Sequence, residues 1–288
     1  MIPAPFDYFS PSTVKEAIAL LHQYGDDAKI LAGGHSLIPM MKLRFANPSH
    51  LIDLNNIPGL SYIKEEGGVL KIGAMTREVD LEESKLIQSK FPIFKDVTKL
   101  IADPQVRNMG TLGGNLAHGD AANDHPAVML ALNAQLVITG AEGNRTIPID
   151  EFFFGFYTTA IQHGEILTEI QIPLPGPKTG SAYNKMERKV GDYATAGVAV
   201  QITLNSKGAC EKVGIGLTNV NATPLRASRS EEVLLGNVPT AEAIEKAALY
   251  ASEDCNPSSD LRGTEEFKRH IVKTITSRII HKALDRAK

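Results

Sequence analysis

The stretch Leu31-Ala32-Gly33-Gly34-His35-Ser36 decides the fold, because a short apolar segment runs directly into two adjacent glycines. Glycine tolerates unusual backbone torsions and lets the chain come close to a ligand. The N–H groups of such a turn can therefore bind a compact anion. Ser36 adds a hydroxyl donor. The stretch predicts a strand that is followed by a phosphate-binding turn.

A second stretch of the same kind runs from Gly110 to Asn115 and contains Gly113 and Gly114. Thr111 supplies a polar side chain at its start. Either stretch alone is more often a tight turn than a ligand site, because short glycine motifs occur frequently by chance. Together they are more informative, since both are flanked by apolar residues and both carry small polar side chains. The pair predicts a cradle for the pyrophosphate of a dinucleotide.

Other common nucleotide and nucleophile motifs are absent. No G-x-G-x-x-G opens a helix after a strand and no G-x-x-x-x-G-K-[ST] is present, which excludes a Rossmann domain and a P-loop. Gly214-Ile215-Gly216 lies inside a strand pattern, where we expect a bulge. G-x-S-x-G is missing, and neither cysteine neighbours a histidine. This absence of a nucleophilic constellation favours redox chemistry carried by a bound cofactor.

Composition indicates an ordinary globular protein. Hydrophobic residues make up 43% and charged residues 22% of the 288 residues, and the formal net charge is −3. A chain without a basic excess is not expected to bind nucleic acid. Cys210 and Cys255 are too few for an iron–sulfur site or a disulfide framework. With no signal-peptide pattern and no apolar run of roughly 20 residues, we expect a cytoplasmic protein without a transmembrane segment.

The first part of the chain shows short alternating helices and strands. Thr13-Val14-Lys15-Glu16 is a capping box that starts a helix ending near Gly25. Strands are expected at 29–32, 51–54, 69–74, 135–139 and 166–172. Helices are expected from a cap at Thr76 to 83, over 93–101, and over 127–132, where Pro126 is favoured in the first turn and Asp124 lies two residues before it.

A boundary is expected at Pro173-Leu174-Pro175-Gly176-Pro177, because three prolines in five residues interrupt a ladder and stiffen a linker. Beyond it, residues 198–204 and 213–219 alternate like strands with one wet face. Residues 240–251 and 264–288 show the pattern of amphipathic helices. Strands followed by helices predict an α+β domain whose helices cover one face of an antiparallel sheet.

One polar cluster, His118, Asp120, Asp124 and His125, has more than one interpretation. Imidazole and carboxylate groups are good metal ligands, but the spacing matches no metal motif. A solvated loop with one helix-capping aspartate is therefore favoured, and no metal site is predicted. Asp124 is alternatively a hydrogen-bond partner for a ribityl or ribose hydroxyl.

The segment 185–196 also has two interpretations. It is either an exposed, charged turn or part of a flavin site. In the second interpretation Lys185 offers a cation to the electron-rich edge of the flavin, and Tyr193 offers a ring that lies against it. The residues alone leave both open.

Residues 32–42 and 109–117 resemble the two FAD loops of the flavoprotein subunits of molybdenum hydroxylases, the xanthine dehydrogenase group. The resemblance extends from Phe6 to the C-terminal helix. Four segments resemble the carbon monoxide dehydrogenase branch of that group: Ile2-Pro3 with Phe6-Asp7-Tyr8, Ile101-Ala102-Asp103-Pro104-Gln105, residues 189–196, and Gly216-Leu217-Thr218-Asn219-Val220. His35 stands where other members carry Asn, and it suits the same branch.

The resemblance implies an α+β fold in three parts. Residues 1–55 and 56–177 would form two FAD-binding lobes of the vanillyl-alcohol-oxidase type, and residues 178–288 a C-terminal flavoprotein domain. The implied cofactor is FAD. Its pyrophosphate would lie on residues 32–36 and 111–115, the ribityl chain near Asp124, and the ring near Lys185 and Tyr193. The implied cofactor-binding residues are Ala32, Gly33, Gly34, His35, Ser36, Leu37, Ile101, Ala102, Thr111, Gly113, Gly114, Asn115, Asp124, Leu167, Lys185 and Tyr193.

The resemblance further implies an electron relay within an oxidoreductase complex. The partners would be a large molybdopterin–copper subunit that oxidises CO with water to CO₂ and a small subunit with two [2Fe–2S] clusters, in a dimer of heterotrimers. FAD would pass the electrons to a quinone-type acceptor, in the cytoplasm or at the inner face of the membrane.

Three alternatives stay open. In the first, the chain is the same subunit of another molybdenum hydroxylase, acting on an aldehyde, a purine or an N-heterocycle. In the second it is a self-contained flavin oxidoreductase, and in the third a non-enzymatic nucleotide-binding module. The relay is favoured over the last two.

Overall fold

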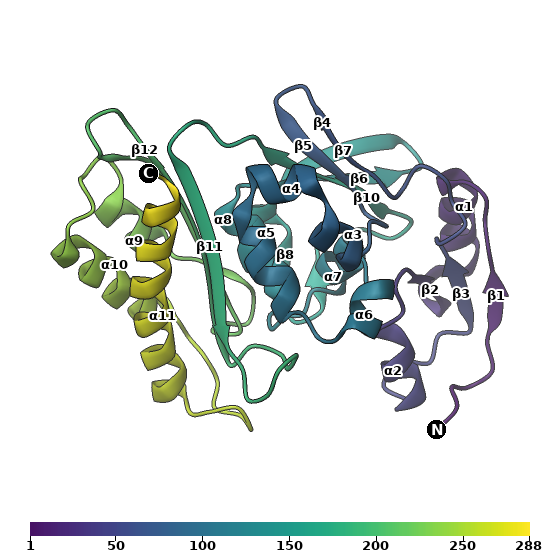
Figure 1. Cartoon of the computed structure of the whole chain (residues 1–288). Coiled ribbons are helices and arrows are strands. Elements are labelled where there is room, and N and C mark those ends of the chain that lie inside the picture. The colour runs from purple at the N-terminus through teal and green to yellow at the C-terminus, as the bar shows by residue number, and fades with distance from the viewer.

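The computed structural model describes all 288 residues, and three main sheets follow one another along the chain (Figure 1). The N-terminal part holds a parallel sheet in the order β1-β3-β2. Its elements are β1 (Asp7–Phe9), α1 (Val14–Tyr24), the 3-10 helix η1 (Gly25–Asp27), β2 (Ala28–Leu31), α2 (Leu37–Lys42) and β3 (His50–Asp53). Strand β2 lies at the edge of this sheet and ends at Leu31, which confirms the strand predicted before the first glycine stretch. The glycine stretch follows β2 directly.

Helix α1 begins and ends as the sequence predicts. The Thr13 side chain accepts a hydrogen bond from the Glu16 N–H at 3.1 Å, and Gly25 follows with a φ of 59°. The reciprocal half of the capping box is shifted, because the Glu16 carboxylate accepts from the N–H and hydroxyl of Ser12. The buried face of the helix, which includes Ala17 and Leu21, packs in one core with residues of β2 and β3.

The middle part is built on an antiparallel sheet in the order β4-β5-β10-β6-β7. Its strands are β4 (Ile63–Glu66), β5 (Val69–Gly73), β6 (Gln135–Gly140), β7 (Gly143–Pro148) and β10 (Ile166–Pro173), and a small hairpin joins β8 (Phe153–Gly155) to β9 (Thr158–Thr159). Its helices are α3 (Glu78–Glu83), α4 (Lys85–Lys90), α5 (Pro92–Val97), η2 (Thr98–Leu100), α6 (Pro104–Met109), α7 (Leu112–His118), α8 (Asp124–Ala131) and η3 (Ile149–Glu151). Phe91, Phe94 and Phe152 are fully buried in its core.

Two expectations for the middle part are wrong. Thr76 does not cap a helix: its hydroxyl pairs with the backbone of Tyr62, and α3 has Arg77 as its N-cap. The second glycine stretch is not a loop but the start of α7, with Thr111 as N-cap. Glycine is a poor helix former, yet here it is required by packing, because a Cβ atom at Gly113 would lie 2.5 Å from the Cβ of Ala74.

The C-terminal part holds an antiparallel sheet in the order β11-β12-β13-β14. Its elements are β11 (Thr179–Met186), β12 (Ala196–Leu204), β13 (Cys210–Thr218), β14 (Leu225–Arg226), α9 (Ser228–Leu234), α10 (Ala241–Asp254) and α11 (Glu265–Arg286). The predicted α+β class is confirmed. The boundaries proposed at residues 55 and 177 fall in connections between sheets and stay predictions.

The expected wet face of this third sheet is wrong, because both faces are covered. Helix α11 packs on β11 and β12, while α8 of the middle part packs on β12 and β13 from the other side (Figure 1). The expected bulge at Gly214 and Gly216 is also wrong. Cβ atoms there would lie 2.1 Å from the Ala131 carbonyl oxygen and 2.0 Å from that of Ala127, so both glycines admit the close approach of α8.

Candidate functional site

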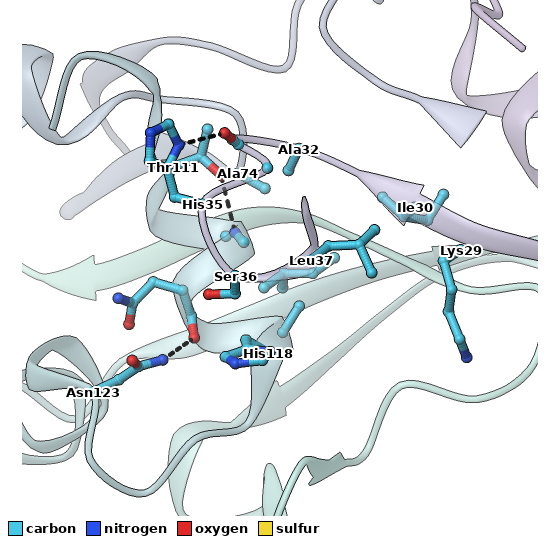
Figure 2. Close-up of a pocket in the computed structure, with 18 of the residues that line it drawn as sticks. Lys29, Ile30, Ala32, His35, Ser36, Leu37, Ala74, Thr111, His118 and Asn123 are labelled. Atoms are coloured by element: carbon cyan, nitrogen blue, oxygen red, sulfur yellow. Dashed lines mark hydrogen bonds between the residues drawn. The ribbon is translucent and has the colours of Figure 1, made fainter. Parts of the chain in front are cut away.

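One cavity of about 850 Å³ lies where the three parts of the chain meet. Figure 2 shows part of its lining, with Lys29 and Ile30 on one side of the first glycine stretch and His118 and Asn123 on the other. The cavity brings together every residue that the resemblance assigns to a cofactor. These are Ala32, Gly33, Gly34, His35, Ser36, Leu37, Ile101, Ala102, Thr111, Gly113, Gly114, Asn115, Asp124, Leu167, Lys185 and Tyr193.

The two glycine stretches touch each other at the wall of this cavity. A Cβ atom at Gly33 would lie 2.4 Å from the carbonyl oxygen of Met109, so only glycine fits at this position. Gly34 has a φ of 74°, in the left-handed region that favours glycine. The Nδ1 atom of His35 lies 2.7 Å from the Gly33 carbonyl oxygen and closes the turn. The geometry therefore joins the two stretches into one cradle.

The second stretch presents polar groups of α7 to the cavity. The Thr111 hydroxyl accepts from the Gly114 N–H at 3.1 Å, and the Asn123 side chain donates to the Asn115 carbonyl at 2.9 Å (Figure 2). Asn115 Oδ1 is buried and has no hydrogen-bond partner within the chain. A buried acceptor without a partner is costly, so this oxygen suits a ligand that donates a hydrogen bond.

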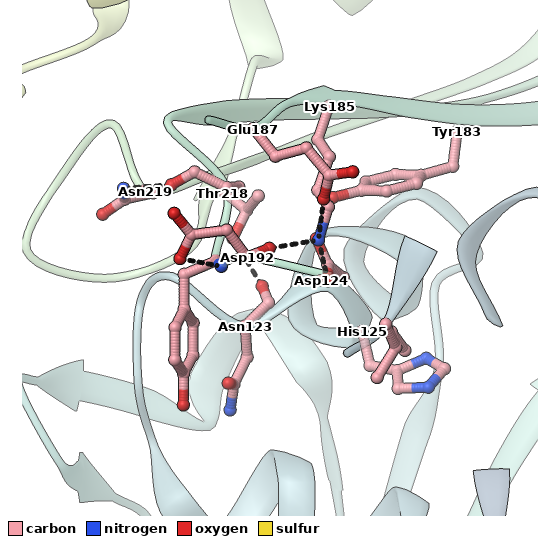
Figure 3. Close-up of polar contacts among 12 residues, drawn as sticks. Asn123, Asp124, His125, Tyr183, Lys185, Glu187, Asp192, Thr218 and Asn219 are labelled. Atoms are coloured by element: carbon pink, nitrogen blue, oxygen red, sulfur yellow. Dashed lines mark hydrogen bonds and ion pairs between the residues drawn. The ribbon is translucent and has the colours of Figure 1, made fainter. Parts of the chain in front are cut away.

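A buried ionic cluster lies at another side of the cavity, where the middle part meets β11. Lys185 Nζ lies 2.9 Å from Asp124 Oδ2 and 3.4 Å from a carboxylate oxygen of Glu187 (Figure 3). The hydroxyl of Tyr183 donates to Asp124 Oδ1 at 2.5 Å. The side chains of Lys185 and Asp124 are only 1% and 8% exposed. Asp124 is thus held on both oxygens by protein groups.

Burial shifts the pKa of two groups in this cluster, Asp124 and Tyr183. It raises the pKa of Asp124, although Lys185 and the Tyr183 hydroxyl favour the charged form. Burial, together with the neighbouring charge of Asp124, raises the pKa of Tyr183 well above its usual range. Tyr183 therefore remains a neutral donor at physiological pH, and Lys185 holds the only full positive charge that touches Asp124.

The polar cluster formed in sequence by His118, Asp120, Asp124 and His125 is divided by the fold. His125 turns away from Asp124 and pairs with Glu78, Nε2 to Oε2 at 2.7 Å. Asp120 accepts from the Ala122 N–H and shapes a turn. The His118 ring lies 5.0 Å from the ring of Tyr157. No three histidine, cysteine or carboxylate groups of the chain are placed to hold a metal ion.

Sequence reasoning missed several residues of the site. Tyr183 escaped notice, although it precedes Lys185 by two on one strand and so shares its face. Asn123, Asp192 and Tyr157 also line the cavity or its cluster. Tyr157 has a φ of 53°, a strained value that no sequence pattern marks.

The arrangement can hold an elongated anionic molecule. Backbone N–H groups and small side chains lie at the joined glycine stretches, and apolar walls are provided by Ile101, Ala102 and Leu167. The glycine cradle, the unpaired Asn115 oxygen and the cationic Lys185 fit a dinucleotide with a ring system at one end. Fold and site thus define a dinucleotide-binding α+β protein.

Comparison with protein families assigns this class more narrowly. A family model described as the FAD binding domain in molybdopterin dehydrogenase matches residues 4–175, and one described as the CO dehydrogenase flavoprotein C-terminal domain matches residues 181–283. The chain belongs to the family of FAD-binding flavoproteins of the molybdopterin dehydrogenases. The predicted family and its cofactor, FAD, are confirmed.

Individual relatives cover the whole chain. The carbon monoxide dehydrogenase medium chain of Hydrogenophaga pseudoflava is 49% identical over 98% of both chains. That of Afipia carboxidovorans is 47% identical over the full length of both. The solved structure of the Hydrogenophaga pseudoflava carbon monoxide dehydrogenase that lacks the Mo-pyranopterin moiety matches with a TM-score of 0.97, at 50% identity over 99% of each chain. No helix of the present chain has the length and apolar character needed to cross a membrane.

Proposed function

We propose that this chain is the FAD-binding electron-relay subunit of an aerobic carbon monoxide dehydrogenase. The observation that carries the proposal is the full-length likeness to two carbon monoxide dehydrogenase medium chains, combined with a single cavity lined by all the residues assigned to FAD. The complex would oxidise CO with water to CO₂ and pass two electrons through this chain. The chain is accordingly an oxidoreductase subunit.

The two glycine stretches would hold the pyrophosphate. The N–H groups of residues 33–36 and the N–H and hydroxyl of Thr111 are the donors available to it, because the N–H groups of the first turn of α7 are already bonded within the chain. The contact of Gly33 with the Met109 carbonyl keeps both sets in one place. Asn115 Oδ1, which has no partner in the chain, would accept from a hydroxyl of the cofactor. When bound, FAD supplies the ability to take up electrons singly and to store two.

Lys185 and Tyr193 would lie at the ring end. Lys185 is fixed by Asp124, Glu187 and the Asp192 carbonyl, so its charge is held in one place without rearrangement. Asp124 would position Lys185 and also lie near the ribityl chain. Tyr193 would place its ring against the flavin, with Ile101, Ala102 and Leu167 excluding water from the walls.

The other subunits would carry the remaining redox centres. Cys210 and Cys255 are both buried and lie on different elements, β13 and the end of α10, so they are not cluster ligands. We propose a large molybdopterin–copper subunit and a small subunit with two [2Fe–2S] clusters, in a dimer of heterotrimers in the cytoplasm. A quinone-type molecule would accept the electrons from FAD.

The proposal is tested on the complex purified through a tag on this chain from its own host. We expect bound FAD, molybdenum, copper and iron, and CO-dependent bleaching of the flavin absorbance. A complex that contains FAD but is reduced only by an aldehyde, a purine or an N-heterocycle would instead assign the chain to another molybdenum hydroxylase. A chain that co-purifies with no metal-containing partner would refute the relay.

A further inference from the structure

The segment that connects β11 to β12 carries Asp192 and Tyr193 into the cavity from the C-terminal part. Tyr193 is partly exposed, with 43% of its surface accessible, so its ring is not fixed by core packing. Its position depends instead on the polar contacts of the segment 188–193. Besides Lys185, these contacts lead to one residue outside the segment, Arg262, which lies between α10 and α11.

Asp192 is the junction of these contacts. Its Oδ1 accepts from the Tyr193 N–H at 2.8 Å and from Arg262 Nη2 at 3.2 Å, and its Oδ2 accepts from Arg188 Nε at 3.0 Å. Its carbonyl accepts from Lys185 Nζ at 2.8 Å. Asp192 therefore joins the buried ionic cluster of Figure 3 to the backbone of Tyr193.

Arg262 contacts Tyr193 by a second route. Its guanidinium carbon lies 5.7 Å from the centre of the Tyr193 ring, within the range of a cation–π interaction. Its Nε atom is buried and has no hydrogen-bond partner in the chain. One side chain thus holds both the backbone of Tyr193, through Asp192, and its ring.

The backbone of Arg262 is held by the neighbouring Asp260, which pairs with Lys268. The Asp260 carboxylate accepts from the Arg262 N–H at 2.7 Å and is paired with Lys268 at 2.8 Å, and the Lys268 side chain is only 2% exposed. This buried support fixes the short segment that precedes α11. A residue placed in this way has lost much of its rotational freedom before any ligand binds.

A close backbone contact at Gly191 also fixes where the segment 188–193 meets the middle part. Gly191 has a φ of 80°, and a Cβ atom there would lie 2.4 Å from the carbonyl oxygen of Ala102. Ala102 lines the cavity and has a φ of 45° itself. The contact brings the segment against the cavity wall, so that Arg262 determines the orientation of the Tyr193 ring and not the path of the whole segment.

We propose that Arg262 is a positioning residue for the flavin, an inference that rests on the proposed function. It holds the Tyr193 ring in the orientation that stacks on the isoalloxazine, and it adds a fixed positive charge next to that ring. Because positive charge favours the more electron-rich form of a neighbouring group, Arg262 raises the reduction potential of the bound flavin.

The test uses the intact complex, with FAD removed and titrated back. Arg262→Gln is expected to raise the FAD dissociation constant about tenfold and to lower the flavin reduction potential. Arg262→Lys keeps the charge and is expected to recover most of the potential but less of the affinity, because an ammonium lacks the planar contact. Arg278→Gln, an exposed arginine on α11, is the matched control and should change neither quantity.

A double-mutant cycle shows whether Arg262 acts on FAD binding through Tyr193. In a Tyr193→Leu background, Arg262→Gln should no longer weaken FAD binding further. A full tenfold effect in that background, or wild-type affinity and potential in Arg262→Gln alone, overturns the inference while FAD binding itself stands. A wild-type complex that binds no FAD overturns the proposed function first, and this inference with it.

Discussion

Gly33 packs directly on Gly110: a Cβ atom at Gly33 would lie 2.7 Å from the Gly110 Cα atom. This contact joins the turn after β2 in the N-terminal part to the connection between α6 and α7 in the middle part. Because backbone meets backbone, neither side can yield by rotating a side chain. The two glycine stretches, which are 77 residues apart (110 − 33), therefore behave as one structural unit.

Gly33→Ala should separate the two glycine stretches. The added methyl group must displace the Met109 carbonyl, at a cost of about 1–3 kcal/mol in unfolding free energy, and residues 33–36 should move away from Thr111. We expect the FAD dissociation constant of the assembled complex to rise at least about tenfold, from a loss of about 1.4 kcal/mol or more in binding, and the complex to lose FAD on dilution. Gly176→Ala is the control, since no atom lies within 4 Å of the new Cβ. Full flavin content in Gly33→Ala would mean that the cradle is not needed.

Lys185→Met should be strongly destabilising. It leaves the buried Asp124 carboxylate with only the Tyr183 hydroxyl, and breaking a buried pair from one side costs about 3–5 kcal/mol. Urea unfolding measures the effect. The double variant Lys185→Met with Asp124→Asn should recover more than half of the loss, because no unpaired charge stays buried. A double variant as unstable as the single one would show that packing, and not charge, explains the cluster.

Gly216→Ala should disturb the interface between α8 and the third sheet. The new Cβ would lie 2.0 Å from the Ala127 carbonyl oxygen, so α8 must move away, and we expect a loss of about 3 kcal/mol in thermal unfolding. Asp124 is the first residue of α8 and should move with it. Gly155→Ala, also in a strand but with its nearest atom at 4.0 Å, is the control and should change stability little. Equal effects of the two substitutions would contradict the packing argument.

Asp96 should make the joint between α5 and α11 sensitive to acid. It accepts from Arg286 at 2.7 and 2.9 Å and from Lys282 at 2.9 Å. Burial acts to raise its pKa, but the hydrogen bonds from Arg286 and Lys282 outweigh burial, and the pKa lies below its usual range. A folded pKa below the unfolded value, about 3.9, means that the ionised form stabilises the fold above that pH. This contribution is lost as the pH falls through the folded pKa.

Asp96→Asn is therefore expected to cost about 2 kcal/mol at pH 7, with a deficit relative to wild type that shrinks below about pH 4. Unfolding measured across this pH range gives the comparison. Asp27→Asn, at an exposed position, should leave the pH profile unchanged. A deficit that stays constant down to low pH would show that the aspartate acts by shape alone.

Local signals in the sequence predict much of this fold. The cap at Thr13 and the apolar spacing of residues 240–251 and 264–288 are visible within a few neighbouring residues, and the helices that they predict agree with the structure. The errors arise where distant segments meet. Gly214 and Gly216 admit the close approach of α8, which lies some 80 residues earlier in the sequence. No residue next to these glycines in the sequence indicates that contact.

The same distinction applies to the site. The glycine stretches were found from their own residues, whereas the roles of Asp124, Lys185 and Tyr193 came from the family resemblance. The fold then brings all of them to one cavity. Arg262 carries no local signal, because its partners Asp192 and Tyr193 lie about 70 residues earlier in the chain.

The most direct test of the account is an experimental density map of the complex with FAD bound. The account predicts phosphate oxygens at about 3 Å from backbone nitrogens of residues 33–36 and from the N–H or hydroxyl of Thr111, with the isoalloxazine beside Lys185 and Tyr193. A map that shows the pyrophosphate away from the joined glycine stretches, or the ring at the Lys29 end of the cavity, would contradict it.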